Sequence, residues 1–83
     1  MKLTALKGIG TVMSEKLKAA GINSAEELTR LGSKAAFAKI KKVYPGVCLV
    51  HLYTLQAAID GVAIALLPPA AKQELKAFND GLK

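Results

Sequence analysis

Apolar residues recur every three or four positions along most of this chain of 83 residues, which is the spacing of one face of an α-helix. Glycines and prolines interrupt the pattern and mark the ends of the predicted helices. Gly21, Gly32, Gly61 and Gly81 each follow a helical segment, at the position where a left-handed residue ends a helix. The pattern predicts helices at about residues 2–6, 11–20, 25–31, 34–44 and 47–60, and a sixth that starts at Pro68-Pro69.

Two serines are predicted to start helices. Ser24 is followed three residues later by Glu27, which is the pattern of a capping box in which the glutamate reaches back to the cap. Ser33 is predicted to cap the fourth helix.

The predicted helices each bury one stripe of apolar residues. The segment 47–60 is apolar on nearly every side, so we place this helix at the centre of the domain. Cys48 in this segment is predicted to be a small core residue. In the other helices the predicted core residues are Met13, Leu17, Ala20, Leu28, Leu31, Phe37, Ile40, Tyr44, Ala71, Leu75, Phe78 and Leu82. Residues that favour strands are sparse. The sequence therefore predicts one all-α domain over residues 1–83, a compact bundle of five to six short helices.

The segment from Leu6 to Gly10 has the pattern of the hairpin in a helix-hairpin-helix motif. Two glycines one residue apart allow a sharp turn, and we expect both to need a positive φ. Ile9 between them is predicted to anchor the turn in the core. The amides of Gly10, Thr11 and Val12 then open a helix, and a helix start with free N–H groups suits one phosphate. The hairpin therefore indicates binding to a nucleic-acid backbone without reading of the bases.

The charge of the chain agrees with that interpretation. Twelve Lys and Arg residues against six Asp and Glu give a net charge of +6, which favours acidic partners such as nucleic acid. Phosphate-binding hairpins often carry a basic residue just after the second glycine, where this chain has Thr11 and Val12. That departure removes a side-chain contact with the phosphate and leaves the backbone amides to bind it. Lys7 and Lys16 are either charges beside the phosphate or ordinary solvated lysines.

Four lysines lie on or beside the fourth predicted helix, and three of them share one broad exposed face. This face is either solvated surface or a second contact with a nucleic-acid backbone. The three lysines are Lys34, Lys41 and Lys42.

Other residues carry little predicted chemistry. His51 and Cys48 are the only histidine and the only cysteine, so neither a metal site nor an internal disulfide is expected. The segment Tyr44–Cys48 echoes the first hairpin, but Cys48 replaces the second glycine, and we interpret it as a structural turn. No catalytic arrangement, cofactor motif, signal peptide or membrane span is recognised, and we expect a cytoplasmic protein.

The whole chain resembles the C-terminal domain of the TfoX/Sxy family of bacterial competence regulators. The stretches that carry the resemblance are Leu3–Gly10, Leu17–Leu28, Leu31-Gly32, Pro45–Leu55 and Leu66–Pro69. The first two are shared by many helix-hairpin-helix modules, including that of the RNA polymerase alpha C-terminal domain, and the stretch from Pro45 narrows the match.

The resemblance implies a small helical domain of bacterial origin that is helix-hairpin-helix-like. In the competence regulators this domain is joined to a separate N-terminal domain, and the two-domain protein promotes transcription of DNA-uptake genes. This sequence begins at Met1 with no such domain ahead of it, so we expect a stand-alone domain. The resemblance indicates a fold more firmly than a function.

Together these features predict a non-enzymatic, sequence-nonspecific nucleic-acid-binding module that needs no cofactor and binds backbone phosphates weakly. The alternative is a protein-interaction module that self-associates as a homodimer or docks on transcription machinery. The predicted nucleic-acid-binding residues are Lys7, Gly8, Ile9, Gly10, Thr11, Val12, Lys16, Lys41 and Lys42.

Overall fold

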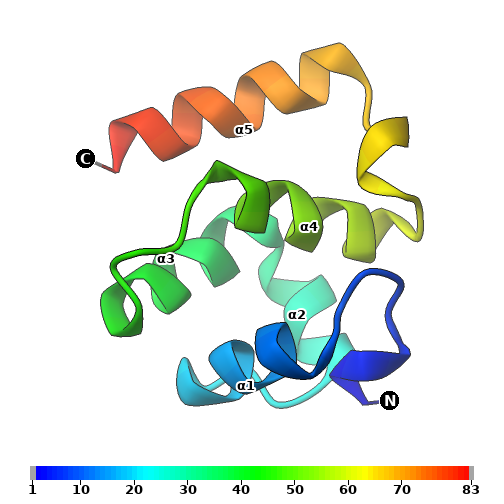
Figure 1. The fold of residues 1–83 in the computed structure, drawn as a ribbon, viewed down its shortest axis with the longest axis vertical. Helices are drawn as coiled ribbons and strands as arrows, with labels where there is room; N and C mark the ends of the chain where they lie inside the picture. The colour runs from blue at the N-terminus through cyan, green and yellow to red at the C-terminus, as the bar shows by residue number, and fades with distance from the viewer. Residues whose placement is uncertain (1, 83) are drawn as a thin grey trace.

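The computed structural model describes residues 2–82, so Met1 and Lys83, the two ends of the predicted domain, lie outside the described residues. Within that range the chain forms five α-helices and two short 3₁₀ turns, and no strand (Figure 1). The elements in order are η1 (Leu3–Ala5), α1 (Thr11–Ala19), α2 (Ala25–Leu31), α3 (Ser33–Val43), α4 (Leu49–Asp60), η2 (Ile64–Leu66) and α5 (Pro69–Gly81). The predicted all-α fold is confirmed.

Helix α4 lies in the middle of the molecule, with α5 along one side and α1 and α2 toward the other (Figure 1). It packs against α3, α5 and η2, and α3 in turn packs against α1 and α2. Leu52 and Leu55 of α4 and Phe37 and Ile40 of α3 are fully buried in one core. Burying each such side chain stabilises the fold by about 1.5–3 kcal/mol. The central position predicted for this apolar helix is therefore confirmed.

The end of α1 shows why the glycine pattern located helix ends. Gly21 has a φ of 87°, and its conformation lets the N–H of Ile22 donate to the carbonyl of Leu17 at 2.8 Å. This bond ends the helix, and the side chains of Leu17 and Ile22 are both buried in the core. The predicted left-handed glycines that have positive φ are Gly21, Gly32 and Gly61. Gly81 does not, because it is the last residue of α5, so the prediction there is wrong.

Helix α2 begins and ends at the predicted residues. The hydroxyl of Ser24 accepts a hydrogen bond from the N–H of Glu27 at 3.2 Å. The Glu27 carboxylate accepts from the N–H of Asn23 at 3.2 Å, one residue before the cap rather than from the cap itself. Both bonds satisfy amides that the helix leaves unpaired, so the capping signal is confirmed with this one shift.

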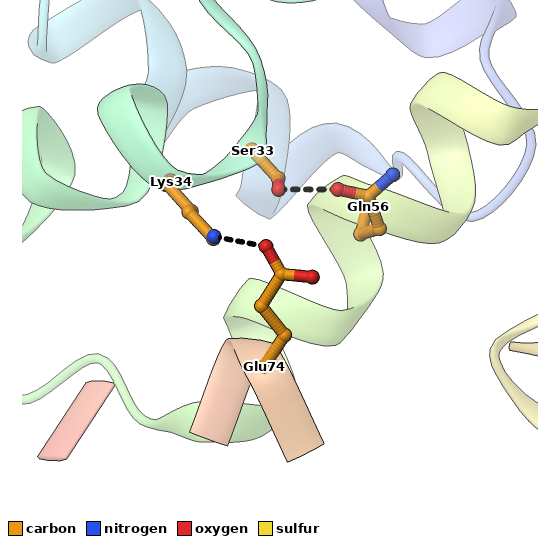
Figure 2. A network of polar contacts seen from close by, with 4 residues as sticks. All are labelled: Ser33, Lys34, Gln56 and Glu74. Atoms are coloured by element: carbon orange, nitrogen blue, oxygen red, sulfur yellow. Dashed lines mark hydrogen bonds and ion pairs between the residues drawn. The ribbon is translucent and has the colours of Figure 1, made fainter. Parts of the chain in front are cut away.

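The predicted role of Ser33 as a cap is wrong, because Gly32 is the N-cap of α3 and Ser33 is its first residue. The buried Ser33 hydroxyl instead donates to Oε1 of Gln56 on α4 at 2.6 Å (Figure 2). Beside it, the Lys34 ammonium lies 2.6 Å from Oε1 of Glu74 on α5 (Figure 2). The start of α3 is therefore tied to both helices that follow it.

Four further predictions are corrected by the structure. The first predicted helix is only the 3₁₀ turn η1. Tyr44 and Leu31 are partly exposed rather than core residues, because each lies at the end of its helix, where the chain reaches the surface. Cys48 is exposed, because it is the N-cap of α4 and precedes the part of that helix that enters the core.

Candidate functional site

The turn from Leu6 to Ile9 is closed by a hydrogen bond from the N–H of Ile9 to the carbonyl of Leu6 at 3.1 Å. Gly8 is the third residue of this turn and has a φ of 85°, a conformation that favours glycine. Ile9 is buried in the core, as predicted. The element before the turn is η1 rather than an α-helix, so the helix-hairpin-helix motif itself stays a prediction.

The second glycine of the turn differs from the first. Gly10 is the N-cap of α1, with φ −90° and ψ −175°, an extended conformation that any residue adopts. A Cβ atom added at this position would meet nothing within 4 Å. The expectation that both glycines need a positive φ is therefore correct for Gly8 and wrong for Gly10.

Helix α1 begins beside this turn with backbone amides that have no partner within the helix. The first helical hydrogen bond runs from the N–H of Ser14 to the carbonyl of Gly10 at 2.9 Å. The amides of Thr11, Val12 and Met13 precede that bond, and helix geometry gives them no partner within the helix. Gly10 has no side chain to accept from them. The positive end of the helix dipole therefore lies at a surface where Thr11 and Val12 are exposed.

The predicted lysines are not all brought to this surface. Lys7 is exposed within the turn, and the Lys16 ammonium lies 5.7 Å from the centre of the Tyr44 ring. Lys41 lies over Phe37 of its own helix, with its ammonium 5.9 Å from the ring centre, and Lys42 is exposed near the end of α3. The structure thus places Lys7 and Lys16 beside the start of α1 and Lys41 and Lys42 on a separate helix.

Two hollows lie between the first turn and α4. The first has a volume of about 380 Å³ and is lined by the start of α1 and the start of α4, including Val12, Lys16 and Val50. The second has a volume of about 350 Å³ and is lined by Lys7, the middle of α4 and residues 62–64. Gly8 and Thr54 line both hollows. We call the two hollows together the α1–α4 groove.

The segment Tyr44–Cys48 has a structure close to that of the first turn. The N–H of Val47 donates to the carbonyl of Tyr44 at 3.1 Å, and Val47 is buried as Ile9 is. Cys48 is extended, with φ −123° and ψ 178°, and caps α4 as Gly10 caps α1. Gly46 lacks the positive φ of Gly8. The echo seen in the sequence is therefore a second turn that shares the closing hydrogen bond and buried apolar residue of the first turn but not its positive φ. Both helices that follow the two turns line the first hollow.

His51 and Cys48 form a local contact at the start of α4. The Nδ1 atom of His51 accepts from the N–H of Cys48 at 3.1 Å and lies 3.4 Å from the Cys48 sulfur. Burial lowers the pKa of His51 below its usual value, and the positive charge of Lys16 lowers it further. His51 is therefore uncharged at neutral pH.

The described residues offer no other cluster with evident chemistry. Among residues 2–82, no three His, Cys, Asp or Glu side chains come together in a group able to hold a metal ion. In the same part of the chain no helix has the length and apolar character needed to cross a membrane. What the surface does offer is an apolar groove lined by the start of α1 and by Lys7 and Lys16.

Sequence reasoning missed Val50 and Thr54 as residues of this surface. Val50 is 59% exposed, although it belongs to a helix that is apolar on nearly every side. The apolar run gave no signal of that exposure, because periodicity cannot show which side of such a helix stays uncovered. The echo of the first turn at Tyr44–Cys48 was the one signal that linked the start of α4 to the start of α1.

Comparison with known proteins supports one family assignment. Two crystal structures of proteins from Listeria monocytogenes, one described as uncharacterized and one as of unknown function, share this fold with TM-scores of 0.95. Each is 39% identical over 99% of this chain, and the matches cover 93% and 100% of those chains. A search of curated proteins gave no match. Residues 1–78 match the family described as the TfoX C-terminal domain, and the chain therefore belongs to that family.

Proposed function

We propose that this chain is a small, non-enzymatic nucleic-acid-binding domain that contacts backbone phosphates. The observation that carries the proposal is the start of α1, where the amides of Thr11 and Val12 follow a cap without a side chain. Lys7 precedes these amides and Lys16 lines the same hollow. A phosphate at this position accepts hydrogen bonds from the amides and interacts favourably with the helix dipole and both ammonium groups.

Binding of this kind does not depend on base sequence. Backbone amides and lysines contact phosphate and sugar, which position a protein on the nucleic acid but do not distinguish one base from another. With only a few such contacts, we expect a dissociation constant on the order of 10⁻⁴–10⁻⁶ M at physiological salt. The net charge of +6 would add to attraction at a distance.

A salt-resolved titration tests the proposal. Fluorescence anisotropy of labelled duplex DNA and of labelled RNA is measured against protein concentration at several salt concentrations. About two to four phosphate contacts give a slope near −2 to −4 in log affinity against log salt, and duplexes of unrelated sequence compete equally. Absence of binding at low salt and high protein concentration would overturn the proposal.

A protein-docking role is the second candidate function, and the apolar lining of the α1–α4 groove favours it. The resemblance to competence regulators suggests that the domain takes part in the control of transcription, whether it binds nucleic acid or docks on a protein. The cytoplasm is the corresponding location, and a single exposed cysteine agrees with a reducing compartment.

A further inference from the structure

The α1–α4 groove leaves apolar side chains open to solvent on both of its walls. Val12 on α1 is 67% exposed and Val50 on α4 is 59% exposed, and both line the first hollow. Ile64 is 37% exposed and lines the second hollow. Exposed apolar side chains that line a common concave surface are characteristic of a site for another protein.

The dimensions of the groove fit a short helical segment. Along α4 the lining runs from Val50 to Ala57, which at 1.5 Å per residue is about 10 Å, or two helical turns. Gly8 and Thr54 line both hollows, so the two hollows adjoin each other at these residues. A partner helix that places apolar residues at i, i+4 and i+7 spans two turns in the same way.

The charges of the groove select an acidic occupant. Lys16 lines the first hollow and Lys7 the second, and no acidic residue is among the described residues that line either one. His51 is uncharged at neutral pH, so the lysines supply the charge of the groove. A second copy of this chain also carries a net charge of +6, and repulsion between two such chains opposes self-association.

We propose that the α1–α4 groove binds an acidic amphipathic segment of a partner protein as a helix. The apolar face of the segment covers Val12, Val50 and Ile64, and its carboxylates lie near Lys7 and Lys16. This docking does not require the chain to bind nucleic acid, although both ligands would use the surface at the start of α1.

Selection from a random peptide library tests the class of partner. The library is displayed on phage, selected on the immobilised chain and depleted on a variant carrying Val50→Gln and Ile64→Gln. We expect recovered peptides to have apolar residues at helical spacing and more Asp and Glu than Lys and Arg. Recovery of mainly basic peptides, or no enrichment over the depleted pool, would overturn the proposal.

Single variants then test the position of the site with a recovered peptide as the probe. Val50→Gln and Ile64→Gln each weaken peptide binding by about tenfold, because each removes an apolar side chain from the interface. Val43→Gln and Leu66→Gln are the matched controls, since both residues are exposed apolar residues outside the groove. All four changes are on exposed residues and are neutral in charge, and circular dichroism verifies that the variants fold. Equal binding by groove and control variants would overturn the proposal.

Two further measurements separate the other occupants. If the chain binds DNA, its DNA affinity should be unchanged in the neutral Val50→Gln variant. A parallel loss of DNA and peptide binding would instead make nucleic acid the ligand of the groove. A dimer mass in solution for the wild type and a monomer mass for Val50→Gln would make a second copy the occupant of the groove. Either result, the parallel loss of binding or this change in mass, overturns the proposal.

Discussion

Gly8 and Gly10 lie in the same turn but have different backbone conformations. Gly8 has a φ of 85°, whereas Gly10 is extended at the start of α1. A residue with a side chain is destabilised in the left-handed region because its Cβ approaches the backbone. The space around the two residues does not explain the difference, since a Cβ at Gly8 would make only an ordinary contact with Thr54.

We therefore expect Gly8→Ala and Gly10→Ala to differ in stability. Gly8→Ala should lower the free energy of unfolding by about 1–2 kcal/mol, which corresponds to a fall in melting temperature of about 4–16 °C in a domain of this size. Gly10→Ala should melt within about 3 °C of the wild type. Thermal unfolding followed by circular dichroism measures both, and equal melting temperatures would contradict the assignment of strain to Gly8 alone.

The lowered pKa of His51 makes the stability of the fold depend on pH. The unfolded chain binds a proton at His51 below a pH of about 6.5, whereas the folded chain resists that proton because of burial and Lys16. The free energy of unfolding should therefore fall as pH decreases through about 6.5 and toward the lower folded-state pKa.

His51→Gln is the matched variant for this prediction. Glutamine at the third residue of a helix can accept from the cap N–H, as His51 does from Cys48, but it does not titrate. Melting temperatures measured from neutral to mildly acidic pH should fall more steeply in the wild type than in His51→Gln. Parallel curves for the two proteins would contradict the lowered pKa.

At the level of helices and turns, the sequence predicted those features that have local causes. The bounds of α2 follow from Ser24, Glu27 and Gly32, which act within a few residues of one another. Ser33 was misinterpreted because its partner, Gln56, lies 23 positions away. A periodic pattern cannot reveal a pairing between two helices, so the starts and faces of helices that depend on such pairings were less well predicted.

The pair formed by Ser33 and Gln56 should stabilise the fold more than the neighbouring ion pair. Ser33→Ala removes a buried hydroxyl and its bond to Gln56, and we expect a cost of about 0.5–1.5 kcal/mol. Glu74→Gln removes the ion pair with Lys34 where both side chains are well exposed, with an expected cost below about 0.5 kcal/mol. Urea unfolding of both variants measures the difference, and a larger loss in Glu74→Gln would reverse this ranking.

At the scale of the whole molecule, the sequence predicted the charge of the chain but not the shape of its surface. The net charge of +6 and the turn at Gly8 were evident from the residues. The α1–α4 groove was not, because Gly8 and Val50 come together only when the central helix packs beside the first turn. The same packing leaves Lys7 and Lys16 at the groove, whereas Lys41 on α3 does not line it.

Charge reversal distinguishes a positioned phosphate site from general attraction. Lys7→Glu places a negative charge beside the start of α1, whereas Lys76→Glu makes the same two-unit change on α5, on the far side of α4 (Figure 1). Lys7→Glu should lose more DNA affinity and reduce the salt slope by about one, the loss of one phosphate contact. Anisotropy titrations at several salt concentrations measure both quantities.

Lys41→Glu extends the comparison to the second basic surface. An intermediate loss of DNA affinity would show that α3 makes its own contact with the backbone, whereas a loss equal to that of Lys76→Glu would identify its lysines as solvated surface. The three variants have the same net charge, so differences among them report position rather than the overall field. Equal losses at Lys7, Lys41 and Lys76 would mean that attraction is general, that the turn at Gly8 is structural, and that the start of α1 does not hold a phosphate.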